Sequence, residues 1–417
     1  MDGNTALNRQ TCIENGRVHS SVYTDWQAFA EEMRVVFENN WVFVAHESEI
    51  PKPGDFIRRT IGVQPVVVTR APDGIRVFAN RCSHRGNLIC AEERGRKRAF
   101  SCQYHGWVFA PDGELLDIPF PEGCAGIDKS KHGLKTAKVS VYRGFIFASF
   151  NHDVPPLEEH LGNGRQALDR AANLSPSGSH SIGRTWIRHM FRANWKMLSE
   201  NEADGYHVTF VHDSFAKAIN IEGKYDNILS DEEEGVSAVC RDLGNGHTEL
   251  DYEATYSRPM EWLGVAEDRY PEYTEAMNQA YGPENAREIM RKGPPHTFIF
   301  PNLFVAETCL VMIQPLSVGE TVNWHTPLLL KDVPDALNQR ILRQGEVAMG
   351  PSAFLTADDA IIAERQWRAL AGSPGWLDIS RGADRESAKP EGVVESHYTD
   401  ETSNRGFWNH YKSLFPA

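Results

Sequence analysis

Two short pairs of metal-ligand residues stand in the first third of the chain. Cys82-Ser83-His84 is followed by seventeen residues and then by Cys102-Gln103-Tyr104-His105. Two thiolates and two imidazoles can hold a structural zinc ion, or a two-iron, two-sulfur cluster in which one iron takes both Cys and the other both His. Zinc sites of this composition usually place the two Cys together and the two His together. Because each pair here contains one Cys and one His, the spacing favours the cluster.

A second group of candidate ligands lies near the middle of the chain, in residues 200–212, where His207 and His212 stand five residues apart. On an ideal helix five residues turn two side chains about 140° apart. One metal ion can therefore bind both only if the helix is kinked, bulged or ends between them, and we predict such a distortion. Two imidazoles and one carboxylate form the facial triad of a non-haem Fe(II) oxygenase. Residues 356–364 offer the carboxylates Asp358, Asp359 and Glu364.

The first pair of motifs lies in a stretch with strand character. Runs of β-branched and aromatic residues occupy 66–69, 75–79 and 145–150, and Pro-Asp-Gly turns occupy 72–74 and 111–113. This pattern predicts a small antiparallel β domain, which we place at residues 41–153. Ahead of it, residues 24–40 have apolar side chains at helical spacing, including Trp26, and predict an amphipathic helix capped by Thr24.

The second group lies in a longer stretch of mixed character. Apolar runs at 297–304 and 311–315 predict strands, and 335–349 and 401–415 have helical periodicity. We therefore predict an α+β fold in which a second, larger domain, residues 1–40 and 154–417, has an antiparallel sheet flanked by helices. The acidic run 231–234 is interpreted as a solvated loop.

Composition limits the function. A chain of 417 residues suffices for two domains with sizeable cores. Its formal net charge of −14 argues against nucleic-acid binding. We find neither a leader pattern nor a run of about twenty apolar residues, so we expect a cytoplasmic protein that does not enter a membrane. The seven Cys are odd in number and scattered, which argues against a disulfide framework.

Taken together, residues 41–417 resemble the large (alpha) subunits of Rieske non-haem iron aromatic-ring-hydroxylating oxygenases, the group that contains naphthalene, benzoate and terephthalate dioxygenases. The resemblance is carried by the Cys82/His84/Cys102/His105 motif, Asn194-Trp195-Lys196, the segment from Glu200-Asn201 to His212, Asp358-Asp359, and the sequence ETSNRGF at 401–407. It implies a small Rieske domain that holds a [2Fe-2S] cluster on Cys82, His84, Cys102 and His105. It also implies a mononuclear Fe(II) in the larger, catalytic domain.

The resemblance assigns the iron ligands. It gives His207 and His212 as two of them and places the carboxylate at Asp359, the second of the paired acids, five residues before Glu364. Asp358 is the runner-up.

Two neighbours receive catalytic roles in the same way. Asp204 would join His207 to His105 of a neighbouring subunit, and a carboxylate between two imidazoles would orient both and offer an electron path. Asn201 falls where the family has an Asn near the iron. Glu202 has no assigned role and is expected to lie in solvent.

The implied reaction is hydroxylation of an aromatic compound by O2 and electrons from NADH. Residues 200–212 are most similar to benzoate-type members, which favours an aromatic acid as substrate. We find no Gly-rich dinucleotide fingerprint, so a separate reductase, with or without a ferredoxin, is expected to deliver the electrons. The implied assembly is a homotrimer with a small β subunit (α3β3), and α3 is the alternative.

Three other functions stay open on the sequence alone. A Rieske monooxygenase that removes N- or O-methyl groups would use the same residues. A Rieske electron-transfer protein would leave His207, His212 and Asp359 without a purpose, and iron in excess of the cluster's share would exclude it. A structural zinc protein would lack a reducible brown chromophore.

Overall fold

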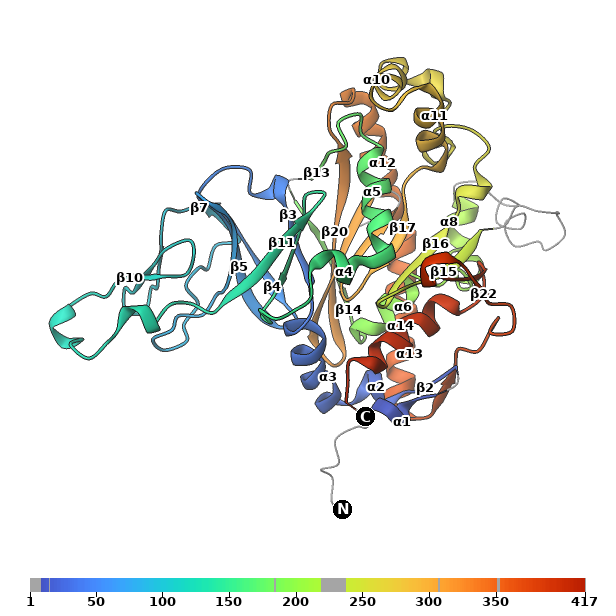
Figure 1. Cartoon of the computed structure of the whole chain (residues 1–417). Coiled ribbons are helices and arrows are strands. Elements are labelled where there is room, and N and C mark those ends of the chain that lie inside the picture. The colour runs from blue at the N-terminus through green and yellow to red at the C-terminus, as the bar shows by residue number, and fades with distance from the viewer. Residues whose placement is uncertain are drawn as a thin grey trace. The chain divides into compact units, whose positions relative to one another are not determined.

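The computed structural model describes residues 9–14, 16–183, 185–218, 238–306, 308–350 and 353–416. The chain divides into two compact units (Figure 1), Met33–Leu157 and the combination of Met1–Glu32 with Glu158–Ala417. The acidic run 231–234 lies outside the described residues. Within the described part, no helix has the length and apolar character needed to cross a membrane.

The unit Met33–Leu157 consists of antiparallel strands that follow a π-helix, Met33–Glu38. Its larger sheet has the order β3-β12-β11-β6-β5-β4-β7, and its smaller sheet has the order β10-β9-β8. The strands are β3 (Val42–His46), β4 (Asp55–Ile61), β5 (Gln64–Ala71), β6 (Gly74–Ala79), β7 (Arg94–Arg96), β8 (Phe100–Ser101), β9 (Val108–Phe109), β10 (Leu115–Asp117), β11 (Thr136–Tyr142) and β12 (Phe145–Ser149). The predicted small β domain is confirmed.

Aromatic packing gives this unit a rigid base beneath its Cys–His motifs. Phe100 packs edge to face against Phe56, at 5.5 Å between ring centroids, and against Phe78, at 5.2 Å. All three rings belong to the buried cluster that contains Cys82 and Cys102. The cysteines are therefore anchored in the core.

The other unit is built on a ten-stranded antiparallel sheet with the order β13-β20-β19-β18-β17-β16-β15-β23-β22, in which β14 also pairs with β20. Its strands are β13 (His180–Ile182), β14 (Ile187–Phe191), β15 (Val239–Gly244), β16 (His247–Asp251), β17 (His296–Ile299), β18 (Leu303–Ala306), β19 (Cys309–Ser317), β20 (Glu320–Leu330), β22 (Ser387–Ala388) and β23 (Val394–His397). A separate three-stranded sheet joins β1 (Ile13–Glu14), β2 (Arg17–His19) and β21 (Trp376–Asp378).

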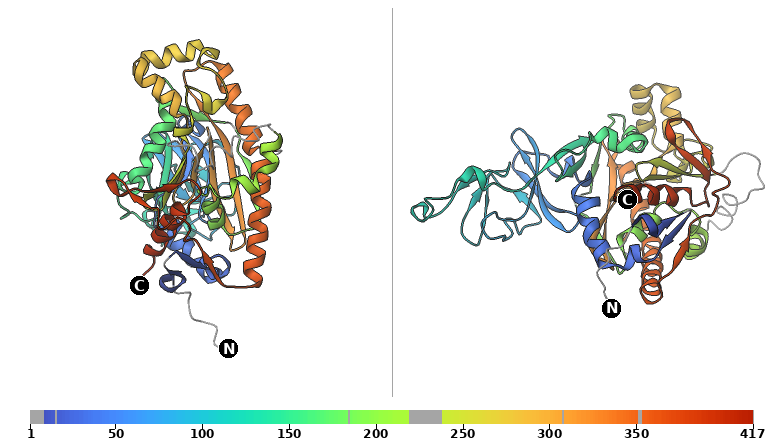
Figure 2. Two further views of the ribbon diagram at one scale, coloured as in Figure 1. Left: turned by 90° about the vertical axis from the view of Figure 1, so that its right-hand side faces the viewer. Right: turned by 60° about the horizontal axis from the view of Figure 1, so that its bottom comes forward.

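This unit also contains α-helices. They are α1 (Arg9–Cys12), α2 (Ser21–Thr24), α3 (Trp26–Glu32), α4 (Leu157–Leu161), α5 (Arg165–Asn173), α6 (Trp195–Asn201), α7 (Val208–Val211), α8 (Asp213–Ala218), α10 (Pro271–Tyr281), α11 (Pro283–Lys292), α12 (Asp335–Met349), α13 (Phe354–Gly372) and α14 (Thr402–Ser413). In the left view of Figure 2, α5 lies on one side of the sheet and the long helices α12 and α13 lie on the other. The predicted α+β fold is confirmed.

Two sequence expectations are wrong in detail. Residues 24–40 do not form one helix: α2 ends at Thr24, and α3 begins at Trp26. The cap is Asp25, whose Oδ1 accepts hydrogen bonds from the amides of the second and third helical residues, at 2.7 and 3.0 Å. Trp26, predicted to pack inward, is 68% exposed.

The run 297–304 is a hairpin, β17 and β18, because Pro301 and Asn302 form a turn in its middle.

Candidate metal centres and substrate cavity

The two Cys–His loops repeat one backbone pattern. In the first, the Cys82 amide donates to the Asn87 carbonyl at 2.8 Å, and the Gly86 amide donates to the Cys82 carbonyl at 3.0 Å. The second loop makes the equivalent two bonds at Cys102, both at 2.8 Å. Gly86 and Gly106 have φ values of 75° and 74°, which favour glycine. Both pairs of candidate ligands are thus presented by the same kind of tight turn.

Backbone amides also point at both sulfur atoms. The donors are His84 and Arg85 for the first cysteine, and Tyr104 and His105 for the second. Burial raises the pKa of the Cys82 thiol, whereas at Cys102 burial is outweighed by hydrogen bonds and the pKa is lowered. Amides aimed at sulfur favour the thiolate, which is the form that binds metal.

The four side chains of the two loops converge with the sulfurs inside and the imidazoles outside. Cys82 and Cys102 are buried and interact directly through their side chains. His84 is exposed and His105 is half-buried, with ring centroids 4.6 Å apart. The His84 ring also stacks on Trp107 at 4.8 Å. A donor set of two buried thiols and two more exposed imidazoles fits a two-iron, two-sulfur cluster, which these four side chains would hold.

His207, His212 and Asp359 come together at the second site. The imidazoles flank the single-turn helix α7, whose backbone leaves the helical conformation at His212 (φ −100°, ψ 21°), so the predicted distortion is confirmed. The two Nε2 atoms are 3.2 Å apart, and Asp359 Oδ1, from α13, lies 3.6 and 3.3 Å from them. The three ligand atoms all lie within 4.8 Å of one another. Two imidazole nitrogens and a carboxylate that face each other closely fit a bound cation.

The outer nitrogen of each imidazole faces a different acid. Asp204 Oδ2 lies 3.5 Å from His207 Nδ1, and Asp358 Oδ2 lies 3.8 Å from His212 Nδ1. Burial alone would lower the pKa of His207, but Asp204 outweighs it and the pKa is raised. Asp358, the runner-up ligand, therefore lies behind His212 and not among the three converging atoms.

Asn201 lies inside this group. Its Nδ2 is 3.2 Å from His207 Nε2 and 3.4 Å from Asp359 Oδ1. The amide is therefore placed to orient a ligand or a water molecule at the site.

The Asn194-Trp195-Lys196 motif anchors the helix that carries Asn201. Asn194 caps α6, with its side chain accepting from the Lys196 amide at 3.2 Å. Lys196 Nζ and Trp195 Nε1 both donate to the carboxylate of Glu32, at 2.7 and 2.8 Å, and all of these side chains are buried. Removal of one partner of a buried ion pair costs about 3–5 kcal/mol, so this anchor holds α6 firmly.

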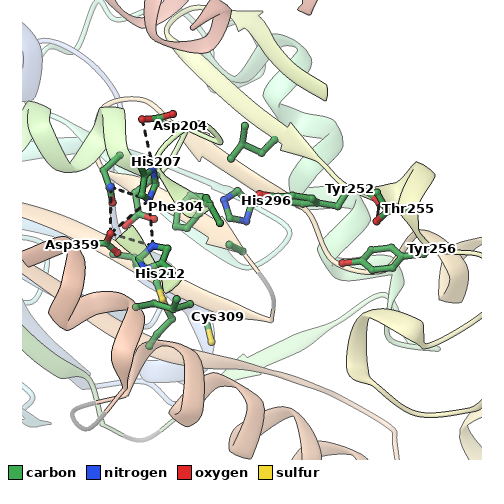
Figure 3. A pocket seen from close by; sticks show the side chains of 18 residues that line it. Asp204, His207, His212, Tyr252, Thr255, Tyr256, His296, Phe304, Cys309 and Asp359 are labelled. Carbon is green, nitrogen blue, oxygen red and sulfur yellow. Dashed lines mark hydrogen bonds and ion pairs between the residues drawn. The ribbon is translucent and has the colours of Figure 1, made fainter. Parts of the chain in front are cut away.

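A cavity of about 250 Å³ opens beside the three converging side chains. Figure 3 shows His207, His212 and Asp359 at one end, Tyr252 at the other end, and His296 between them. The walls are mainly apolar, with Leu250, Phe304, Val311, Met349 and Leu355 among the lining residues. No Arg or Lys occurs among the described residues that line it.

The expectation that Glu202 lies in solvent is wrong. It follows the last residue of α6 and lines the cavity, and burial together with the nearby Asp359 raises the pKa of its carboxyl well above the usual value. One sequence signal was available: Glu202 stands four residues after the buried Leu198, so a continuing helix places both on one face. His296 and Tyr252 carry no such local signal, because β-strands distant in sequence bring them to the cavity.

Two family models match the chain. Residues 40–137 match the Rieske [2Fe-2S] domain, and residues 172–416 match the ring hydroxylating alpha subunit (catalytic domain). The 2-halobenzoate 1,2-dioxygenase large subunit of Burkholderia cepacia is 32% identical over 90% of this chain and 82% of its own. The N,N-dimethyl phenylurea N-demethylase subunit alpha of Sphingobium sp. (strain YBL2) is 32% identical over 87% and 82%. Naphthalene 1,2-dioxygenase with indole in its active site superimposes with a TM-score of 0.84, at 27% identity over 98% and 94% of the two chains.

The chain therefore belongs to the alpha subunits of ring-hydroxylating oxygenases, the enzymes that combine a Rieske domain with a catalytic non-haem iron domain. The resemblance drawn from the sequence is confirmed. A Rieske [2Fe-2S] cluster and a mononuclear iron are the cofactors of this class, and the donor sets described above fit both groups.

Proposed function

We propose that this enzyme is the terminal oxygenase of a multicomponent system that adds both atoms of O2 to an aromatic ring, with electrons derived from NADH. The convergence of His207, His212 and Asp359 at one end of a ring-sized cavity carries the proposal. Such a triad leaves open positions for oxygen beside the substrate. An engineered cavity of about 150 Å³ holds benzene, so the cavity of about 250 Å³ has room for a substituted ring.

In this proposal each group of side chains has one task. Cys82, His84, Cys102 and His105 hold the cluster, and His207, His212 and Asp359 hold the iron, with Asp358 outside the ligand set. When bound, the cluster and the iron supply electron transfer and oxygen activation.

The residues around the iron ligands orient those ligands and shield the site from water. Asp204 fixes the orientation of the His207 ring through Nδ1. Asn201 holds its amide against the open side of the site. The apolar walls, with Phe304 and Val311, hold the ring and exclude water.

An aromatic acid is the substrate class that the sequence favoured, and the 2-halobenzoate relative supports it. The naphthalene relative acts on an uncharged ring. The described lining of the cavity offers no Arg or Lys to a carboxylate and includes the acids Glu202, Asp204 and Asp359. We therefore propose an uncharged aromatic compound as the substrate and keep an aromatic acid as the alternative. A comparison of benzoate with benzamide distinguishes the two.

The electron donors and the assembly are part of the proposal. A reductase, with or without a ferredoxin, passes electrons to the cluster. Three copies of this chain form a ring, with a small β subunit attached, and Asp204 of one copy faces His105 of the next. The relatives support this because their names describe one subunit of a larger enzyme.

The test is product analysis under labelled oxygen. The loaded enzyme, a heterologous ferredoxin and reductase, NADH and ¹⁸O2 are incubated with toluene, naphthalene, benzoate and benzamide. We expect products with two labelled atoms on adjacent ring carbons. Hydrogen peroxide as the only product of oxygen would contradict the proposal.

A second candidate function is oxidative N-demethylation, because one relative of 32% identity is an N-demethylase and an acidic side chain, Glu202, faces the cavity. N,N-dimethylaniline in the same assay separates the two functions. Formaldehyde and N-methylaniline would identify demethylation, and a dihydroxylated ring would identify dioxygenation.

A further inference from the structure

One wall of the cavity lies where helix α12 approaches the start of strand β19. Cys309, the first residue of β19, and Met349, the last residue of α12, both line the cavity. Figure 3 shows Cys309 on the side of the cavity where His212 and Asp359 lie, and Tyr256 on the other side. This wall therefore bounds the space in which a ring would lie beside the iron ligands.

A glycine on α12 leaves the space that the Cys309 sulfur occupies. Gly345 is buried and lies one turn before Met349, on the same face of the helix. A Cβ atom at Gly345 would lie 2.7 Å from Cys309 Sγ, and beyond the backbone of α12 itself no other described atom lies within 4 Å of it. Atoms in ordinary contact are about 3.5–4.0 Å apart. A side chain at this position would therefore displace either the helix or the sulfur.

Helix α12 is fixed just before this glycine. Arg340 Nη2 donates to the carbonyl of Leu263 at 2.8 Å, and Gln344 Nε2 donates to the carbonyl of Trp262 at 3.0 Å. Between these two side chains, Ile341 is fully buried in an apolar cluster. A retreat of the helix would break both hydrogen bonds and open that cluster. The sulfur, at the end of a short side chain, moves more easily.

The open space beside the sulfur is the cavity. Cys309 lies between two other strands, because its Cα partners are Ala306 on β18 and Pro327 on β20. The residue is buried, and the volume next to it is the cavity that it lines. To restore an ordinary contact with an added methyl group, the sulfur would have to move about 1 Å. That movement would narrow the cavity at the end where the iron ligands lie.

From this geometry we infer that the contact between Gly345 and Cys309 sets the width of the cavity beside the iron ligands, and that the glycine admits aromatic compounds of two fused rings. The cavity of about 250 Å³ is larger than the cavity of about 150 Å³ that holds benzene. Cys309 is a specificity-determining residue, and Gly345 is a positioning residue that acts through it. The inference rests on the proposed function and narrows its substrate class.

The test compares the binding of toluene with that of naphthalene. Equilibrium dialysis against the loaded, resting enzyme measures both dissociation constants without an electron donor, so the result is independent of turnover. In the wild type, naphthalene should bind about tenfold more tightly than toluene, because its second ring buries additional apolar surface.

Gly345→Ala should weaken naphthalene binding about tenfold and leave toluene binding nearly unchanged, since one methylene in a hydrophobic pocket discriminates about 10- to 200-fold. Cys309→Ala removes the sulfur, so the double variant Gly345→Ala/Cys309→Ala should regain naphthalene binding to within about threefold of the wild type. General damage by the alanine would not be rescued in this way. Gly372→Ala, at the last residue of α13, is the matched control, because a Cβ there meets nothing within 4 Å.

Gly345→Ala should fold, because alanine favours a helix more than glycine does. The cluster spectrum and the iron content of each variant check that the enzyme is fully loaded. If Gly345→Ala does not fold, Cys309→Leu adds bulk to the same wall directly and should cause the same selective loss of naphthalene binding.

The inference is overturned if the wild type binds toluene as tightly as naphthalene, or if Gly345→Ala weakens the binding of both compounds equally or of neither. Failure of the double variant to regain naphthalene binding would also overturn it. Turnover decides the proposed function separately. The expected ratios with no oxygen incorporated into the ring would sustain the role of Gly345 and reject ring hydroxylation, whereas hydroxylation with unchanged ratios would reject only the role of Gly345.

Discussion

His207 offers its two ring nitrogens to different partners. Nε2 faces His212 and Asp359, and Nδ1 lies 3.5 Å from Asp204. Since each nitrogen has its own task, the two functions of this residue can be separated by substitution. The same holds for the two iron sites, because no cluster ligand belongs to the triad.

Replacement of His207 by Ala should remove the mononuclear iron and lower turnover by more than about 100-fold, because one of three protein ligands is lost. The cluster's visible and paramagnetic spectra should stay unchanged, since its four ligands lie in the other unit. Metal analysis and absorption spectroscopy measure both effects on one sample. A bleached cluster in this variant would show that the two centres are not independent.

Asp204→Asn should keep the iron and slow oxidation of the reduced cluster by substrate and O2 about 10- to 100-fold, because the amide orients the His207 ring less strongly than the carboxylate does. Stopped-flow absorbance of the cluster follows this step. Asp213→Asn changes an exposed acid on α8 that pairs with Lys217, and is the control. Equal rates in the wild type and Asp204→Asn would remove the proposed electron path.

How far the sequence predicts single residues depends on spacing. The cluster motif is visible because its ligand types stand two or three positions apart, and the triad because His207 and His212 lie near each other. His296 has no such neighbour, and only the pairing of β17 with β18 and β16 brings it to the cavity. The error at Glu202 was avoidable, because its spacing from the buried Leu198 places both residues on one face of a continuing helix.

Helix α6 is held in place by buried polar contacts that no pattern in the sequence indicates. Glu200 on this helix accepts hydrogen bonds from Tyr23 and Trp408. Burial raises the pKa of Glu200 to about 7. This carboxyl therefore ties α6 to α2 and α14, and it does so as a neutral group at low pH.

Glu200 should make the stability of the catalytic unit depend on pH. Because the pKa of its carboxyl is raised from 4.5 to about 7 in the folded protein, the folded state binds more protons between these values, and stability falls as pH rises through that window. The loss is at most about 3 kcal/mol. Glu200→Gln should remove this part of the dependence, which urea unfolding at pH 5 and pH 8 measures. Parallel pH curves for the variant and the wild type would contradict it.

Gly106→Ala should weaken the second Cys–His loop, because its φ is 74° and a Cβ would lie 2.8 Å from Pro119. We expect the free energy of unfolding of this unit to fall by about 1–3 kcal/mol. The cluster absorbance should then be lost at a temperature several degrees lower than in the wild type. Gly126→Ala is the matched control, as a Cβ there meets nothing within 4 Å. The iron content of the triad should be equal in both variants.

Long helices and strands whose apolar residues repeat with one period can be predicted from the sequence, whereas short ones cannot. Residues 335–349 form α12 as predicted, since Leu337 and Ile341 repeat at helical spacing and face the core. The hairpin of β17 and β18 is missed because its turn interrupts an apolar run without a polar cluster. The break between α2 and α3 is missed because Thr24 and Asp25 are both good caps, and tertiary packing decides between them.

At the scale of the whole molecule, the proposed trimer makes electron transfer a property of neighbouring chains. A chain that lacks the iron, His207→Ala, and a chain that lacks the cluster, Cys102→Ala, should each form inactive trimers. An equal, random mixture of the two chains should recover about a quarter of the wild-type activity, because half of the chains keep the iron and half of their neighbours keep the cluster, and purified mixed trimers should recover about a third. No recovery in purified mixed trimers would place the whole electron path within one chain.

The most direct measurement of the central claim is the iron content of the loaded chain and of its triad variant. We predict about three irons per chain in the wild type, two in the cluster and one at the triad, and loss of one in His212→Ala with the cluster spectrum intact. Two irons per chain in fully loaded wild type, or an unchanged content in His212→Ala, would contradict the account.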